Sequence, residues 1–133
     1  MIVDCAHYRD GRRQHEGPME PEEAAAICGR EPGFVWVGMV DPPPDELVSM
    51  QQVFGLHELA VEDAQSFHLR PKVELYEGDV YFVVLRTAVD DVSADRIVFG
   101  EVSMFIGPRF VISVRQGSSS DLHPARLRLE RRV

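Results

Sequence analysis

The residues most suggestive of chemistry form an acidic stretch between residues 41 and 66. This stretch has no lysine or arginine and six acids: Asp41, Asp45, Glu46, Glu58, Glu62 and Asp63. Carboxylate oxygens are ligands that Mg²⁺ prefers, and because the ion keeps several waters, one or two carboxylates can hold it. Adjacent Glu62 and Asp63 therefore suit a water-mediated divalent-cation site, with an affinity on the order of millimolar. The simpler alternative is a solvated face on two short helices.

Two histidines flank this carboxylate pair. His57 lies five residues before Glu62, and His68 lies five residues after Asp63. A transition-metal site is one interpretation, but these spacings match no strong motif and the His-Glu-x-x-His pattern is absent. Helix capping or a partly buried structural role is the favoured interpretation for both histidines.

Motifs for covalent and nucleotide chemistry are missing. The serines at 118–120 form a polar segment, and the sequence has no Gly-x-Ser-x-Gly, Gly-x-Gly-x-x-Gly or P-loop pattern. Cys5 lies in an apolar segment, where an inert buried thiol is expected. The sequence therefore predicts a protein that is not an enzyme.

The composition of the chain excludes several classes of protein. The 133 residues suit a single domain, 1–133, and 44% of them are apolar, which excludes bulk disorder. A net charge of −8 argues against a nucleic-acid partner, which requires a basic face. Cys5 and Cys28 form neither a disulfide framework nor a zinc motif. No secretory signal is visible, and no apolar run approaches the roughly 20 residues that span a membrane.

Helices are needed to position the acids. Proline, early acids and a closing glycine predict a first helix over 19–29, and the prolines at 42–44 begin a second that ends at Gly55. A third begins near His57, runs through Ala64 and ends before Arg70-Pro71. Around that proline, Glu74 and Glu77 are candidate ion-pair partners of Lys72 or Arg70.

Apolar runs predict the strands, which are residues 2–8, 12–16, 34–40, 72–76, 80–87, 97–106 and 109–114. Asp90-Asp91 and the segments at 77–79 and 107–108 serve as short connections, which favour antiparallel neighbours. Residues 80–85 are apolar on both faces, which predicts helices on both sides of the sheet. The expected fold class is α/β, an α/β/α sandwich around one mixed, largely antiparallel sheet. A final helix over 121–133 lacks a C-terminal signal, so we expect the chain to be a piece of a longer protein.

Two blocks of sequence resemble the cytoplasmic amino-terminal domain of the CorA family of magnesium transporters. Residues 54–64, Phe-Gly-Leu-His-Glu-Leu-Ala-Val-Glu-Asp-Ala, are similar to the family's Leu-His-Pro-Leu-x-x-Glu-Asp stretch. Residues 70–76, Arg-Pro-Lys-Val-Glu-Leu-Tyr, resemble its Arg-Pro-Lys-x-Glu-x-Tyr/Phe segment. Glu58 replaces the family's usual proline, and the family's Gly-Met-Asn pore signature lies outside this chain.

The resemblance implies a regulatory role. Family members are homopentamers, and cytoplasmic Mg²⁺ binds between the amino-terminal domain of one subunit and a stalk helix of its neighbour. Glu62 and Asp63 match the amino-terminal domain's contribution to that site, and the helix at 121–133 would begin the stalk. The resemblance thus implies a soluble Mg²⁺-sensing domain at the cytoplasmic face of the plasma membrane, attached through helices that lie beyond this chain.

Two alternatives remain open from the sequence. One is the same domain of a zinc-transporting relative, and Co²⁺ or another divalent ion could replace Mg²⁺ as ligand. The other is a stand-alone acidic cytosolic interaction domain without catalysis. Two apolar segments of about 20 residues downstream would distinguish a transporter from that interaction domain.

Overall fold

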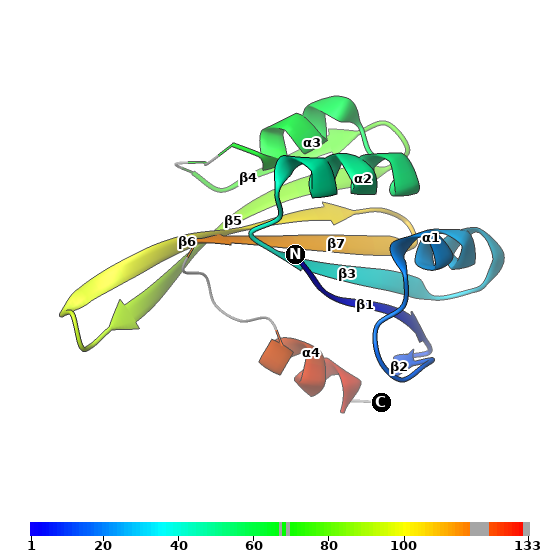
Figure 1. The fold of residues 1–133 in the computed structure, drawn as a ribbon, viewed down its shortest axis with the longest axis horizontal. Helices are drawn as coiled ribbons and strands as arrows, with labels where there is room; N and C mark the ends of the chain where they lie inside the picture. Colours follow the sequence, from blue (N-terminus) through cyan, green and yellow to red (C-terminus); the bar gives the residue numbers. More distant parts are fainter. Residues whose placement is uncertain (67, 69, 118–122, 132–133) are drawn as a thin grey trace.

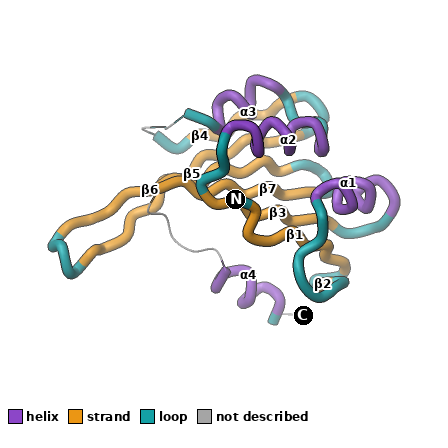
Figure 2. Tube along the Cα trace, in the orientation of Figure 1, coloured by secondary structure: helices purple, strands orange, loops and turns teal. Residues whose placement is uncertain are grey.

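The computed structural model describes residues 1–66, 68, 70–117 and 123–131. Its described part is one seven-stranded sheet with four helices (Figures 1 and 2). The strands are β1 (Ile2–Arg9), β2 (Arg12–Arg13), β3 (Phe34–Val40), β4 (Lys72–Tyr76), β5 (Val80–Asp91), β6 (Arg96–Ile106) and β7 (Phe110–Gly117). The helices are α1 (Pro21–Arg30), α2 (Pro44–Phe54), α3 (Glu58–Ala64) and α4 (His123–Glu130).

The sheet confirms the expected mixed and largely antiparallel pairing. Its strand order is β2-β1-β3-β7-β6-β5-β4, and β3 with β7 is the one parallel pair among the described strands. Strands β4 to β7 form an antiparallel meander, joined by short connections as their spacing predicts. The chain reaches β4, at the far edge of the sheet, through α2 and α3.

The hydrophobic core lies between the sheet and α1, α2 and α3, which share one face (Figure 1). Side chains alternate along each strand, so every second residue points into this core. The sheet contributes buried residues such as Val37, Phe82 and Ile112, and the helices contribute residues such as Leu47 and Val61. Five of the six acids of the stretch, all but Asp41, therefore lie on α2 and α3, two of the helices that cover this core.

Among the described residues, α4 is the one helix on the opposite face, where it lies near β1 and β3. Tyr8 and Trp36 of these strands line a hollow of about 230 Å³ against Leu129 of α4, and the Tyr8 hydroxyl donates to Glu130 at 2.7 Å. The α/β/α arrangement is confirmed, but the described part of the second layer leaves much of the sheet open. Alternate residues of β4 and β5 remain exposed there: Val73, Leu75, Tyr81 and Leu85. We expected helices on both sides of residues 80–85. Among the described residues, helices cover only the face that carries Phe82 and Val84.

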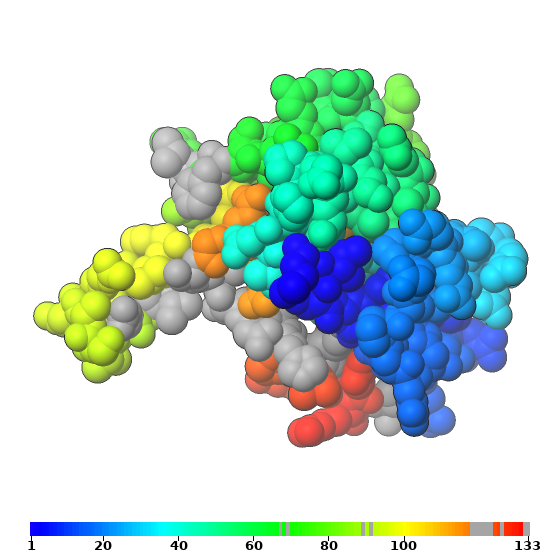
Figure 3. Space-filling view, in the orientation of Figure 1, coloured from blue at the N-terminus to red at the C-terminus, as the bar shows by residue number. Residues whose placement is uncertain are grey.

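Strands β5 and β6 extend further than the sequence predicts. Asp90-Asp91 continue β5 instead of forming a turn, and the connection lies at residues 92–95, where Asp95 adopts a left-handed φ of 49°. Because β4 pairs only as far as Val84 and β7 only as far as Gly100, the end of this hairpin projects as an arm (Figure 3). The predicted turn at Asp90-Asp91 was wrong because the hairpin continues beyond its neighbours in the sheet.

Other boundaries differ at the ends of the chain. The expected strand over 12–16 is reduced to β2, whose Arg13 forms a bidentate ion pair with Asp4 at 2.9 and 3.0 Å. Of the predicted helix over 121–133, residues 123–130 are helical, and 121, 122, 132 and 133 lie outside the described residues.

Both cysteines are free. No described helix combines the length and the apolar composition needed to span a membrane.

Candidate divalent-cation site

Helix α3 presents the adjacent carboxylates. It begins after His57, whose Nδ1 accepts a hydrogen bond from the backbone N–H of Leu59 at 3.1 Å. Ala60, Val61 and Ala64 occupy the face buried against the core. With this face fixed, Glu62 points to solvent and Asp63 lies at the boundary between the helix and the sheet. The favoured capping role of His57 is confirmed.

Glu62 and Asp63 line the same shallow hollow, of about 260 Å³. Its other lining residues are Leu59, Ser66 and Tyr76. The Glu62 side chain is exposed, and its carboxylate has no hydrogen-bond or ion-pair partner within the described ranges. The structure therefore brings together the two residues that the sequence singles out, in a position open to water.

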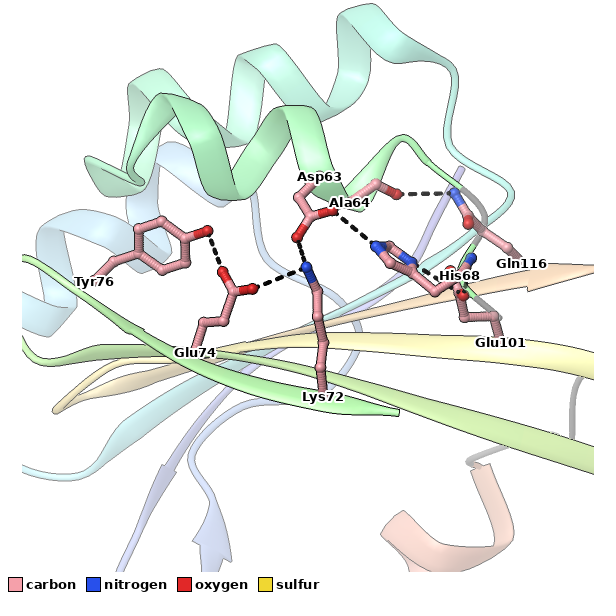
Figure 4. Close-up of polar contacts among 8 residues, drawn as sticks. All are labelled: Asp63, Ala64, His68, Lys72, Glu74, Tyr76, Glu101 and Gln116. Carbon is pink, nitrogen blue, oxygen red and sulfur yellow. Dashed lines mark hydrogen bonds and ion pairs between the residues drawn. The ribbon is translucent and has the colours of Figure 1, made fainter. Parts of the chain in front are cut away.

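Asp63 is held by two cationic groups, as Figure 4 shows. Its Oδ1 accepts a hydrogen bond from His68 Nε2 at 2.8 Å, and its Oδ2 pairs with the ammonium of Lys72. Partial burial would raise the pKa of Asp63, but the hydrogen bonds from Lys72 and His68 outweigh burial and hold it below its ordinary 3.8. Asp63 is thus a charge-compensated carboxylate, in contrast to Glu62.

Three polar side chains of β4 share the face that points toward α3. Lys72, Glu74 and Tyr76 alternate along the strand, and Lys72 Nζ donates to Glu74 Oε1 at 3.0 Å. The Tyr76 hydroxyl donates to Glu74 Oε2 at 2.7 Å. This bond raises the pKa of Tyr76 to about 12, and together with the bond from Lys72 it lowers the pKa of Glu74. The expected pair between Lys72 and Glu74 is confirmed.

His68 connects Asp63 to a buried carboxylate on β6. Its Nδ1 lies 3.1 Å from Oε1 of Glu101, and its backbone N–H donates to the same oxygen at 2.8 Å. Glu101 is 0% exposed, and its Oε2 has no hydrogen-bond partner in the described part of the chain. Burial lowers the pKa of His68, but the hydrogen bonds to Asp63 and Glu101 raise it above 6.5 overall. Two carboxylate neighbours favour the imidazolium, which donates from both ring nitrogens.

The remaining acids of the stretch do not gather around this hollow. Glu46 pairs with the amino terminus at 2.9 Å, and Asp41 accepts from the backbone of Gly117 at 3.0 Å. Asp45 and Glu58 lie in the first turns of α2 and α3, where a negative charge favours the helix. Across the described ranges, no group of three or more His, Cys, Asp or Glu side chains is arranged to hold a metal ion.

Sequence reasoning missed the roles of Lys72 toward Asp63 and of Glu101 toward His68. A signal for the first existed: β4 alternates polar Lys72, Glu74 and Tyr76 with apolar residues, and here the polar set faces the helix. The signal for the role of Glu101 was its position as an acid inside the otherwise apolar part of β6. Neither signal names a partner, because that requires knowing that β4 and β6 lie beneath α3.

Known proteins with a similar sequence are transporters by name. A family model described as "CorA-like Mg2+ transporter protein" matches residues 31–132. The cobalt/magnesium transport protein CorA of Thermotoga maritima is 29% identical over 85 residues, which make up 64% of this chain and 24% of that protein. A putative metal ion transporter of Bacillus subtilis, YfjQ, is 27% identical over 96 residues, which make up 72% of this chain. The chain spans only 28% of the length of YfjQ and 24% of the length of the Thermotoga protein.

Solved structures show the same fold. The full-length CmaX protein superimposes with a TM-score of 0.77 at 18% identity, over 98% of this chain and 39% of that one. The cytoplasmic domain of ZntB from Vibrio parahaemolyticus gives a TM-score of 0.65 at 11% identity, over 96% of this chain and 48% of that one. The family match over 31–132 includes α3, β4 and β6, which carry the carboxylates and their partners. The chain belongs to the CorA-like Mg²⁺ transporter family.

Proposed function

We propose that this chain is the cytoplasmic regulatory domain of a CorA-like divalent-cation transporter, and that Glu62 and Asp63 contribute to a weak Mg²⁺-sensing site. One observation carries the site: two carboxylates adjacent in sequence line the same water-open hollow on α3. Membership of the family supports the wider role. The fold is shared with a cytoplasmic domain from a protein of known structure.

The donor set suits Mg²⁺ better than a softer ion. Glu62 offers an exposed carboxylate, and Asp63 keeps its negative charge at every pH above its lowered pKa. Mg²⁺ favours oxygen ligands and loses its waters reluctantly, so an open hollow with one or two carboxylates matches its chemistry. Bound there, the ion would supply positive charge that offsets the repulsion between carboxylates across an interface. Co²⁺ is the natural second ion for comparison.

Two carboxylates form an incomplete site, so the remaining ligands must come from elsewhere. We propose that residues 1–133 form one domain of a longer chain, with stalk and membrane helices after residue 133. In the homopentamer that we propose for the whole protein, a neighbouring subunit's stalk would supply the other carboxylates. Loss of the ion would then leave like charges facing each other, which biases the assembly toward another state.

The site can be tested by titrating Mg²⁺ into the chain while following its amide NMR signals. We expect millimolar binding with shifts centred on α3. Glu62→Gln removes the exposed carboxylate, so binding should weaken by roughly threefold or more. Glu58→Gln is the matched control, because Glu58 is an exposed acid of the same helix that does not line the hollow. Equal weakening in both variants would show a diffuse charge effect and would contradict a site at Glu62 and Asp63.

The wider role has a separate test in the gene sequence that follows the codon for Val133. We expect two apolar segments of about 20 residues, with Gly-Met-Asn at the end of the first. Absence of both segments from the complete gene would contradict the transporter proposal, whatever the outcome of the Mg²⁺ titration.

A further inference from the structure

Lys72 is the only lysine in the chain, and its ammonium lies between two carboxylates. It pairs with Oδ2 of Asp63 on α3 and with Oε1 of Glu74 on its own strand, at 3.0 Å (Figure 4). From this geometry we propose that Lys72 acts as a tethered cation that competes with Mg²⁺ for Asp63, and so sets the ion concentration to which the site responds. This inference rests on the proposed function of Glu62 and Asp63.

Competition follows from how Asp63 is occupied. His68 contacts Oδ1 and Lys72 contacts Oδ2, so a cation that binds this carboxylate directly competes with both groups for its charge. His68 is the firmer partner: its side chain is 12% exposed and is also anchored to buried Glu101. Lys72 is 30% exposed and sits at the end of a flexible four-carbon chain. Lys72 is therefore the group that yields to an arriving ion.

Glu74 gives Lys72 a second acceptor after displacement. The Glu74 carboxylate is 43% exposed and is oriented by the Tyr76 hydroxyl, so it stays in place when Asp63 changes partner. Displacement then breaks one of the two ion pairs of Lys72 and keeps the other. The hydrogen bond to Asp63 raises the pKa of Lys72 above 10.5, so the competing charge persists at neutral pH.

Removing the competing charge is the direct test. Lys72→Met keeps an unbranched chain that can pack over the Phe82 ring, whose centroid lies 5.7 Å from Nζ. Without the ammonium, Asp63 and Glu74 both become free to attract a dication, so we expect the Mg²⁺ dissociation constant to fall roughly tenfold. Lys72→Arg keeps the charge and should leave the dissociation constant within about twofold.

A matched control separates local competition from net charge. Arg12→Met removes the same charge at β2, on the opposite edge of the sheet from β4, where the Arg12 side chain is exposed. It should change Mg²⁺ binding far less than Lys72→Met. Thermal unfolding of each variant checks that it is folded before the titration.

The single lysine also gives a readout of displacement in the unaltered chain. With ¹⁵N- and ¹³C-labelled lysine, the side-chain NMR signals belong to Lys72 alone, and Mg²⁺ should shift them with the same midpoint as the amides of α3. In Asp63→Asn, which lacks the contested carboxylate charge, this shift should be lost.

The outcomes separate the two proposals. If Mg²⁺ binds at α3 in the unaltered chain but Lys72→Met binds no more tightly than Arg12→Met, the competition is wrong and the sensing site stands. If Mg²⁺ shifts the α3 amides but leaves the lysine signals unchanged, the competition is again wrong. If no variant shows saturable binding at α3 up to about 50 mM Mg²⁺, well above the expected millimolar range, the sensing site itself fails.

Discussion

Asp63 and Glu62 are neighbours in sequence but differ in chemistry. Glu62 is a surface carboxylate without a polar partner among the described residues, whereas Asp63 lies in the middle of a chain of polar contacts that runs from Tyr76 on β4 to buried Glu101 on β6. Removing the carboxylate charge therefore has different consequences at the two positions. At Glu62 we expect the effect to be confined to the proposed ion binding, and at Asp63 we expect it to reach the fold as well.

A pH prediction follows from His68. Its folded pKa is raised above 6.5 by Asp63 and Glu101, against the opposing effect of burial. Its contribution to stability is therefore complete below about 6.5 and is lost as the pH rises through the folded pKa. Arg86 of β5 also contacts this segment, through a hydrogen bond from its guanidinium to the His68 carbonyl. The difference in unfolding free energy between the unaltered chain and His68→Gln should shrink as the pH rises through that window.

Urea denaturation at a series of pH values without divalent ions measures this difference. Subtracting the His68→Gln curve removes every contribution that the two proteins share. Parallel curves across the window would show that His68 is not protonated preferentially in the folded state.

Among the elements, the short helix α3 begins with a side-chain cap, which α1 and α2 lack. His57 Nδ1 accepts from Leu59 N–H, and the His57 ring packs on Tyr76 with centroids 5.0 Å apart. We expect His57→Ala to destabilise the chain by about 1 kcal/mol, the usual loss at a helix N-cap. His57→Asn keeps a capping acceptor and should recover most of that loss in urea denaturation. If Asn is no better than Ala, the ring contact with Tyr76 matters more than the cap.

The helices and most strands could be predicted because local signals define them. Residues 34–40 and 72–76 match β3 and β4 residue for residue, since each is an apolar or alternating run between turn signals. The end of β5 could not be predicted, because Asp90-Asp91 favours a turn locally and the antiparallel pairing with β6 overrides it. The partners of Asp63 depend on the long-range placement of β4 and β6 under α3, which no local pattern encodes.

For the molecule as a whole, we expect Mg²⁺ to stabilise this chain only slightly. If the proposed site of two carboxylates has a dissociation constant of about 10 mM, then ~10 mM ion adds only ~0.4 kcal/mol. For a domain of this size that corresponds to a shift in thermal midpoint of roughly 1–3 °C. Calorimetry with Mg²⁺, and with Na⁺ at matched ionic strength, measures the specific part. A large shift at micromolar Mg²⁺ would reveal a complete site within the chain.

The parallel pairing of β3 with β7 has a consequence for how the chain folds. It joins Val35 to Phe110 across 75 residues of sequence, whereas the meander of β4 to β7 is built from neighbours. Contacts between distant residues carry a larger entropic cost of loop closure and form more slowly. The contacts of Asp63 with His68 and Lys72, and of His68 with Glu101, all lie within residues 63–101. None of them requires the pairing of β3 with β7. We therefore expect the carboxylate cluster to assemble early, before β3 docks and completes the sheet.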